Sequence, residues 1–258
     1  MQDLTNALQE GHYAKKQLYN RKAGLISWGH RARFQVALRL AKQYAAGKRL
    51  LDYGCGDGTF LAMLVSEPGG PAEAVGSELY QNLVDDCAKR FGPETGLRFV
   101  SVANLGTAGR FDTVFCMEVL EHVVELDEVI DRLAGVLNDS GKLIVSVPVE
   151  TGLPLLVKQA ARRVAAWRGI GHYPGSDPYT LRDYAASIFA GSQQHIQRPI
   201  HAGENNTVFH DHKGFNWMAL RDRLGRRFQL ESVLSSPIGW LPPHLGSQAW
   251  FVLSKKRP

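Results

Sequence analysis

Length, composition and charge set the first limits on this chain. Its 258 residues are 44% apolar and 21% charged, with a formal net charge of +5, which indicates an ordinary globular protein with enough chain for a large core. No apolar run is long enough to cross a bilayer, and the N-terminus lacks the pattern of a secretory signal. The positive charge is modest and forms no long basic block, so we expect no nucleic acid partner.

Three cysteines, Cys55, Cys87 and Cys116, fit no metal-ligand spacing. They fall in apolar segments, where a free cysteine behaves as a small apolar residue. We expect a cytoplasmic protein, because a reducing compartment suits them.

Short apolar runs alternate with helical patterns along much of the chain. Residues 5–46 show a helical pattern that ends at Gly47-Lys48. We expect strands at 49–53, 72–78, 97–100, 111–117 and 142–147. The expected helices between them are 58–66, 80–91 and a pattern that follows Met117 and runs to Leu137, before a turn at 138–141. This alternation predicts a parallel sheet with helices on both faces and ligands at the carboxyl ends of the strands.

The alternation lapses between about 148 and 213, where prolines and glycines are frequent. We interpret this stretch as an insertion. A helix at 214–223 and strands at 228–234 and 247–254 then complete the pattern.

The most informative motif is the turn after the first expected strand. Asp52 ends the apolar run, and Gly54, Gly56 and Gly58 follow in a Gly-x-Gly-x-Gly spacing that allows a sharp bend and close approach of a ligand. An acid at this strand end suits a cationic group, and Glu78, at the end of the next strand, suits the two hydroxyls of a ribose. The turn has no basic residue, which argues against a pyrophosphate. We therefore expect a ligand with a ribose, an ammonium group and no phosphate.

Three segments resemble motifs of the class I S-adenosylmethionine-dependent methyltransferases. They are Leu51–Gly58 (LDYGCGDG), Phe111–Val123 (FDTVFCMEVLEHV) and Gly141–Pro148 (GKLIVSVP). The second segment is most similar to the O-methyltransferases of ubiquinone biosynthesis. The resemblance implies an α/β fold with a Rossmann-like, doubly wound sheet of seven strands, mostly parallel with an antiparallel last strand.

The same resemblance implies one methyltransferase domain over residues 1–258. Its parts would be N-terminal helices (1–47), a cofactor-binding core (48–147), an acceptor lid insertion (148–213) and a C-terminal completion of the sheet (214–258).

The resemblance also implies that S-adenosylmethionine is the cofactor. Many members place an acid after the third strand, where this chain has Asn104. The alternative for Asp52 and Glu78 is that they cap helices. The glycine spacing disfavours an NAD-dependent dehydrogenase. The implied roles are the methionine part for Asp52, Gly54, Cys55 and Gly56, the ribose for Glu78, the adenine face for Leu79, the adenine edge for Asn104 and the cofactor amino group for the Met117 carbonyl.

His122 is the candidate catalytic base, with Glu121 nearby to orient it. Methyl transfer is an in-line displacement at a sulfonium, so the protein mainly aligns the acceptor and removes its proton. The alternative is that His122 bonds within its own loop. Glu118, Glu121 and His122 have helical spacing and would share one face, a pattern that suggests a divalent cation in the ubiquinone-type relatives. They could equally cap a helix, and we expect no metal; His210-Asp211-His212 is weak evidence for one.

The acceptor is expected to be a small molecule, such as a phenol, a sugar or a lipid-like intermediate, methylated on oxygen. Methylation on nitrogen or carbon, and an inactive cofactor-binding partner protein, are the alternatives. Residues 153–168 form a basic, amphipathic segment. Such a segment can make weak peripheral contact with an anionic membrane, or pack on its own domain with the basic side outward.

Overall fold

The computed structural model describes residues 7–8, 10–11, 13–18, 24–167, 179–194, 196–203 and 207–256. Parts of the expected N-terminal helices and of the expected lid lie outside these ranges. The chain divides into two compact units. The first contains Met1–Met117, Arg132–Ile144 and Leu253–Arg257, and the second contains Glu118–Asp131, Val145–Val252 and Pro258.

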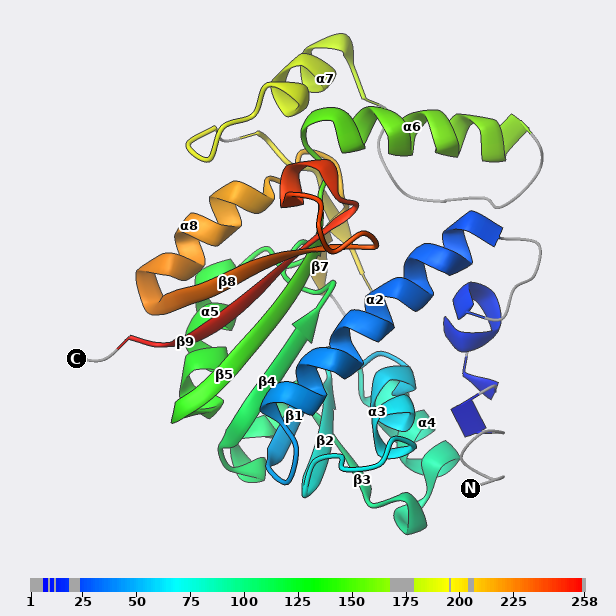
Figure 1. The fold of residues 1–258 in the computed structure, drawn as a ribbon, viewed down its shortest axis with the longest axis vertical. Coiled ribbons are helices and arrows are strands. Elements are labelled where there is room, and N and C mark those ends of the chain that lie inside the picture. Colours follow the sequence, from blue (N-terminus) through cyan, green and yellow to red (C-terminus); the bar gives the residue numbers. More distant parts are fainter. Residues whose placement is uncertain are drawn as a thin grey trace. The chain divides into compact units, whose positions relative to one another are not determined.

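Seven strands form a sheet in the order β3-β2-β1-β4-β5-β9-β8, mostly parallel with an antiparallel last strand, which confirms the predicted fold class (Figure 1). The pairings of β1 with β2, of β1 with β4 and of β2 with β3 are parallel. The strands are β1 (Arg49–Tyr53), β2 (Glu73–Glu78), β3 (Leu97–Ser101), β4 (Phe111–Met117), β5 (Leu137–Pro148), β8 (Phe228–Ser236) and β9 (Gln248–Lys255).

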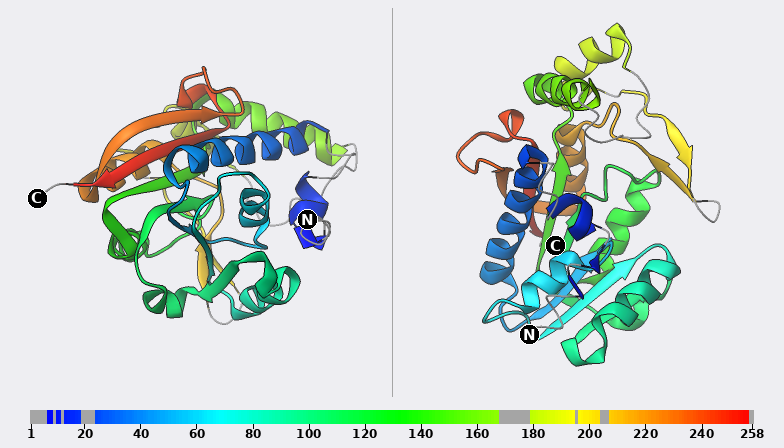
Figure 2. Two further views of the ribbon diagram at one scale, coloured as in Figure 1. Left: turned by 60° about the horizontal axis from the view of Figure 1, so that its bottom comes forward. Right: turned by 90° about the vertical axis from the view of Figure 1, so that its right-hand side faces the viewer.

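In the first unit, apolar strands are buried between helices. Leu50 and Leu51 of β1 are fully buried, because the strand lies between two neighbours and is covered on both faces. Phe60 of α3 lies against Phe34 of α2 and Phe115 of β4, and Phe91 of α4 stacks on Phe99 of β3. The strand register places Phe115 and Phe99 on one face of the sheet, so α2, α3 and α4 lie on that same face. α4 packs against β2 and β3 (Figures 1 and 2). These helices are α2 (Gly24–Tyr44), α3 (Thr59–Val65) and α4 (Gln81–Phe91), and the short helical turns are η1 (Ala14–Leu18), η3 (Pro93–Thr95) and η4 (Val102–Ala108).

The expected insertion contains regular elements of its own in the second unit. It holds two helices, α6 (Gly152–Trp167) and α7 (Leu181–Ile188), and an antiparallel pair, β6 (Ile200–Ala202) and β7 (Val208–His210). The later helix is α8 (Trp217–Arg227), which begins after Asn216 because the Asn216 side chain accepts hydrogen bonds from the Met218 and Ala219 amides. Among the described residues, no helix combines the length and the apolar character needed to cross a membrane.

Two local predictions differ from the structure. The helix expected directly after Met117 begins only at Leu126, as α5 (Leu126–Val136), and the turn expected at 138–141 belongs to β5. Glu118 has a φ of 55°, which is incompatible with a helical start there. Asn138 stays in strand conformation while its Nδ2 donates to Asp112 Oδ1 of β4 at 2.7 Å.

Gly76 provides a test of packing in the first unit. A Cβ at this position would lie 2.7 Å from Phe99 Cδ1 and 2.8 Å from Cys55 Sγ. We expect Gly76→Ala to lower the free energy of unfolding by about 1–3 kcal/mol in urea titrations, because both neighbours are held in the core. Gly135→Ala is the matched control: no atom lies within 4 Å of its Cβ, and Ala favours helix, so stability should rise by about 0.5 kcal/mol. A Gly76→Ala protein as stable as the wild type would contradict this packing.

Candidate functional site

The turn between β1 and α3 is held open by backbone geometry. Gly54, Gly56 and Gly58 all have positive φ, at 77°, 55° and 73°. Gly58 also has no room for a side chain, since a Cβ would lie 2.7 Å from Phe91 Cε2. The amides of Gly54 and Cys55 both donate to the Ser77 carbonyl, at 2.8 and 3.0 Å, and so fasten the turn to β2. The result is a rigid backbone bend that a ligand can approach closely.

Glu78 lies beside this turn at the end of β2. Its carboxylate accepts hydrogen bonds from the Gly56 amide at 3.0 Å and from the Leu79 amide at 2.7 Å. Glu78 does not cap a helix, because the Gly56 and Leu79 amides lie outside α3 and α4. Each of its carboxylate oxygens can accept more than one bond. Leu79 is 55% exposed and offers an apolar surface next to the carboxylate.

Asp52 is the most unusual group of the first unit. The residue is only 2% exposed, and its Oδ1 has no hydrogen-bond partner among the described residues. Burial, and after it the negative charge of Glu78, raise the pKa of Asp52 to about 8. A buried carboxyl in this state favours a cation that would restore its charged form.

The remaining expected cofactor residues of the first unit differ in how they are presented. The Cys55 side chain is buried, and its hydrogen bond with Cys87 and its burial raise its pKa well above the usual value, so only its backbone faces the turn. Asn104 is exposed on η4, and its carbonyl accepts from Thr107 Oγ1 at 2.7 Å. Met117 is the last residue of β4 and is partly exposed.

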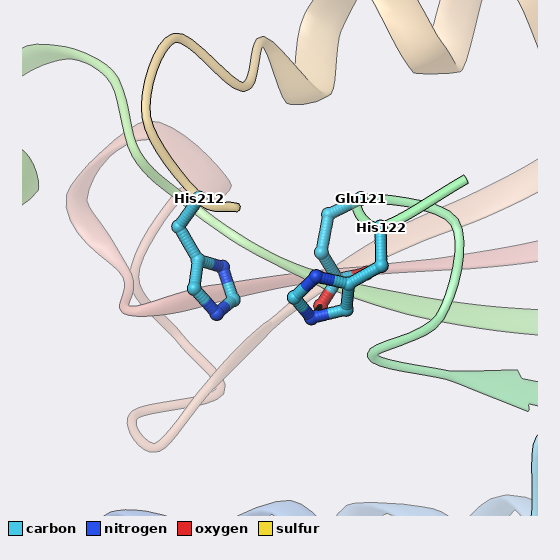
Figure 3. A group of neighbouring side chains, drawn as sticks. All are labelled: Glu121, His122 and His212. Carbon is cyan, nitrogen blue, oxygen red and sulfur yellow. Dashed lines mark ion pairs between the residues drawn. The ribbon is translucent and has the colours of Figure 1, made fainter. Parts of the chain in front are cut away.

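In the second unit, a carboxylate and two imidazoles come together (Figure 3). One ligand atom each from Glu121, His122 and His212 lies within 4.8 Å of the others. The rings of His122 and His212 meet edge to face, with centroids 4.8 Å apart. Two imidazoles and a carboxylate are donors that suit a divalent transition metal, and they equally suit proton transfer.

Hydrogen bonds fix the orientation of the His122 ring. Its Nδ1 lies 2.8 Å from the His210 carbonyl, and the His210 amide donates to the His122 carbonyl at 2.9 Å. A carbonyl only accepts, so Nδ1 carries the proton and Nε2 keeps its lone pair. Nε2 lies 3.8 Å from Oε1 of the fully buried Glu121. The ring is therefore poised to accept a proton, or to bind a metal, at Nε2.

Arg198 holds the two loops of the cluster together. Its Nη2 donates to the Glu121 carbonyl and, at 2.7 Å, to the Asp211 carbonyl. Burial lowers the pKa of Arg198 to about 10, although the nearby Glu121 and Asp211 carboxylates oppose this shift. Arg198 was not predicted from the sequence, because nothing near it in the chain marks a basic residue of the insertion as structural.

Glu118, one of the three residues of the alternative cation group, lies apart from the other two. Glu118 does not join Glu121 and His122: its carboxylate instead accepts from Ser146 Oγ at 3.0 Å and from Gln248 Nε2 at 3.2 Å. His212 takes that place. Burial lowers the pKa of His212 to about 4, so this imidazole is neutral, and its Nδ1 has no hydrogen-bond partner among the described residues.

Comparison with known proteins identifies the family. A family model described as a methyltransferase domain matches residues 26–187. The chain belongs to this family. The match confirms the predicted methyltransferase family and the prediction that the protein is an enzyme.

Among curated relatives, the methyltransferase is 38% identical over 112 residues to a ubiquinone biosynthesis O-methyltransferase of Xanthomonas axonopodis pv. citri. That match covers 41% of this chain and 45% of the relative, so the chain spans about half the length of the curated relatives it matches.

Solved structures share the fold of the methyltransferase. Magnesium protoporphyrin IX methyltransferase from Synechocystis, solved with bound S-adenosylhomocysteine, has a TM-score of 0.54 at 17% identity and covers 98% of this chain and 94% of its own. An S-adenosylmethionine-dependent methyltransferase from Clostridium acetobutylicum has a TM-score of 0.56 at 11% identity and covers 94% and 96%. At 17% and 11% identity, these matches show the shared fold.

The raised pKa of Asp52 gives a stability prediction. Between its ordinary pKa of 3.8 and about 8, the folded state binds more protons than the unfolded state, so stability falls as pH rises through this range. Asp52→Asn should remove this decline and raise the free energy of unfolding at about pH 8 by about 1–3 kcal/mol. Urea titrations across the range measure it.

Asp112→Asn is the control with the opposite sign. Hydrogen bonds from the Asn138 side chain and the Arg49 amide lower the pKa of Asp112, so its charged form stabilises the folded state. This substitution should lower stability at about pH 8. An Asp52→Asn protein less stable than the wild type at that pH would show that the carboxyl is charged and compensated.

Proposed function

We propose that the protein is an S-adenosylmethionine-dependent O-methyltransferase that acts on a small-molecule acceptor. The observation that carries the proposal is the buried Asp52 carboxyl, with no hydrogen-bond partner for Oδ1, next to the glycine turn and Glu78. A ligand with a positive charge and a ribose would pair with Asp52 and bond to Glu78, and S-adenosylmethionine is such a ligand. The similarity to relatives named ubiquinone biosynthesis O-methyltransferases supports oxygen as the methylated atom.

The cofactor contacts follow from the first unit. Asp52 would hold the cationic methionine part of the cofactor in its charged form, beside Gly54 and Gly56. Glu78 would accept the ribose hydroxyls, and the exposed Leu79 would pack against the adenine. Asn104 would lie near the adenine edge, and the Met117 carbonyl would accept from the cofactor amino group.

His122 removes the proton of the acceptor. When bound, S-adenosylmethionine would supply an activated methyl group for transfer to the acceptor oxygen, with its sulfur as the leaving group. The hydroxyl proton passes to His122 Nε2, whose lone pair the Nδ1 contact with the His210 carbonyl leaves available. The Glu121 carboxylate stabilises the imidazolium that forms.

The insertion supplies the acceptor side of the reaction. We propose residues 148–213 as the acceptor lid, since loops and short elements on a rigid sheet commonly set specificity. A phenol, a sugar or a lipid-like intermediate remains the proposed acceptor class. The three cysteines are free and buried, which supports a cytoplasmic location.

Cofactor binding tests the first half of the proposal. Glu78→Gln should weaken binding of S-adenosylmethionine by about 1–3 kcal/mol in calorimetry, because charge-assisted hydrogen bonds to the ribose are lost. Glu67→Gln, at an exposed position between α3 and β2, is the matched control and should bind as the wild type does. Equal affinity in a folded Glu78→Gln protein would refute the ribose contact, and tighter binding of NAD than of S-adenosylmethionine would refute the cofactor.

Turnover tests the base. With a panel of phenols, sugars, lipid-linked alcohols and amines, S-adenosylhomocysteine release identifies the acceptor. His122→Gln should reduce kcat by about 10²–10⁴-fold and keep cofactor affinity. The exposed His244→Gln is the control and should change neither.

Chelation separates a base from a metal ligand. Full activity in EDTA supports His122 as the base. Activity that is lost in EDTA and restored by a divalent ion would instead make His122 Nε2 a ligand, together with Glu121 and His212. Transfer to amines alone would overturn oxygen methylation.

A further inference from the structure

The second unit exposes an apolar helix face that its own packing leaves uncovered. On α6, Leu153, Leu156 and Val157 are 61%, 41% and 69% exposed, and Ala160 and Ala161 are exposed as well. These positions follow the spacing i, i+3, i+4, i+7, i+8, which is the stripe that a globular helix normally turns toward its core. Among the α6 residues whose burial is described, the buried ones are Pro154 and Leu155, near its start.

The basic side of this helix does not turn outward as a whole, unlike the packed alternative considered from the sequence. Lys158 Nζ lies 3.0 Å from Glu150 Oε1 and 3.1 Å from the Val149 carbonyl, and Glu150 is buried. Lys158 therefore attaches α6 to the unit, while the apolar stripe faces solvent.

Neighbouring segments of the same unit also carry exposed apolar side chains. α6 packs against α7 and against η6 (Pro243–Leu245) (Figures 1 and 2). In the segment that leads to η6, Trp240 is 83% exposed. α7 carries Leu181 at its start, 89% exposed, and is followed by Phe189, 82% exposed. Exposed apolar groups gathered on contacting elements mark a protein or membrane contact rather than scattered surface residues.

The charge of this surface favours a membrane over a protein as the partner. Across α6, α7 and residues 237–246 the sequence has one acid, Asp183, and Lys213 Nζ neutralises it at 3.0 Å. Arg163 and Arg182 are exposed on the two helices. A surface with leucine, valine and tryptophan side chains, exposed arginines and no uncompensated acid matches an anionic bilayer, into which apolar side chains insert while arginines meet headgroups.

We propose that α6 and the Trp240 segment dock on the surface of an anionic lipid bilayer. The contact is peripheral, because among the described residues no helix is suited to crossing a membrane. It is a statement about the second unit alone and does not depend on methyl transfer.

Vesicle flotation of the full chain tests the proposal without an activity assay. Wild-type protein should float with vesicles that mix phosphatidylglycerol into phosphatidylcholine, float less with phosphatidylcholine alone, and lose binding as salt rises. The double variant Leu153→Glu, Val157→Glu should reduce the bound fraction by about tenfold or more, because two inserted apolar side chains are replaced by charges that anionic lipid repels. Trp240→Ala should reduce it less.

Matched variants keep the result specific. Leu230→Glu replaces an apolar residue of β8 that is 36% exposed, and Trp28→Ala replaces a tryptophan of α2 that is 45% exposed. Both should float as the wild type does, and thermal melts check that every variant is folded. A wild type that stays unbound at low salt overturns the proposal, as does a double variant that floats fully. If the wild type does not float and light scattering shows a dimer that the double variant converts to a monomer, the face joins copies of this chain instead.

Discussion

A carboxyl group withdrawn from water is the constraint on which the cofactor half of this protein depends. Asp52 ends a buried strand, its Oδ1 has no hydrogen-bond partner among the described residues, and Glu78 adds further negative charge. Such a group lowers the stability of the unliganded protein at neutral pH and gains most from a cation. Ligand binding requires no further rearrangement of the backbone, because the Ser77 carbonyl and the positive φ angles already fix the turn. The buried Asp52 carboxyl lowers the stability of the unliganded protein, while the binding geometry is already formed before the ligand binds.

In the second unit, hydrogen bonds hold polar side chains in place on loops. The His122 ring and the His210 carbonyl bond across 88 residues of sequence, and the returning bond from the His210 amide makes the contact reciprocal. Arg198 joins the same two loops through their carbonyls. A histidine on an unsupported loop would rotate freely. Here its tautomer and its direction follow from backbone groups of the insertion, so the insertion positions the proposed base.

What could be predicted from the sequence is what local signals determine. Strands β1 and β4 have the expected bounds, and β2 and β3 differ from theirs by one residue. Apolar runs bounded by glycine, proline and acidic residues can be recognised from the sequence alone. Asp52 and Glu78 were found for the same reason, since strand ends of a parallel sheet are where such acids matter. Glu118 was misplaced because its partners, Ser146 and Gln248, are remote in the chain. His212 and Arg198 join the cluster through tertiary contacts, and the residue spacing within their own segment does not predict those contacts.

The apolar helix and the histidine cluster are linked through electrostatics inside the second unit. The Glu150 carboxylate raises the pKa of His212, whereas Lys158 of α6 lowers it, and the two charges pair at 3.0 Å. Burial is the larger influence and keeps this imidazole neutral. Moving α6 away would remove Lys158, which lowers the pKa of His212, and so raise the proton affinity of that imidazole. The helix that carries the exposed stripe is thus also the helix that balances charge beside the proposed base, so its seating on the unit bears on the chemistry whatever covers its outer face.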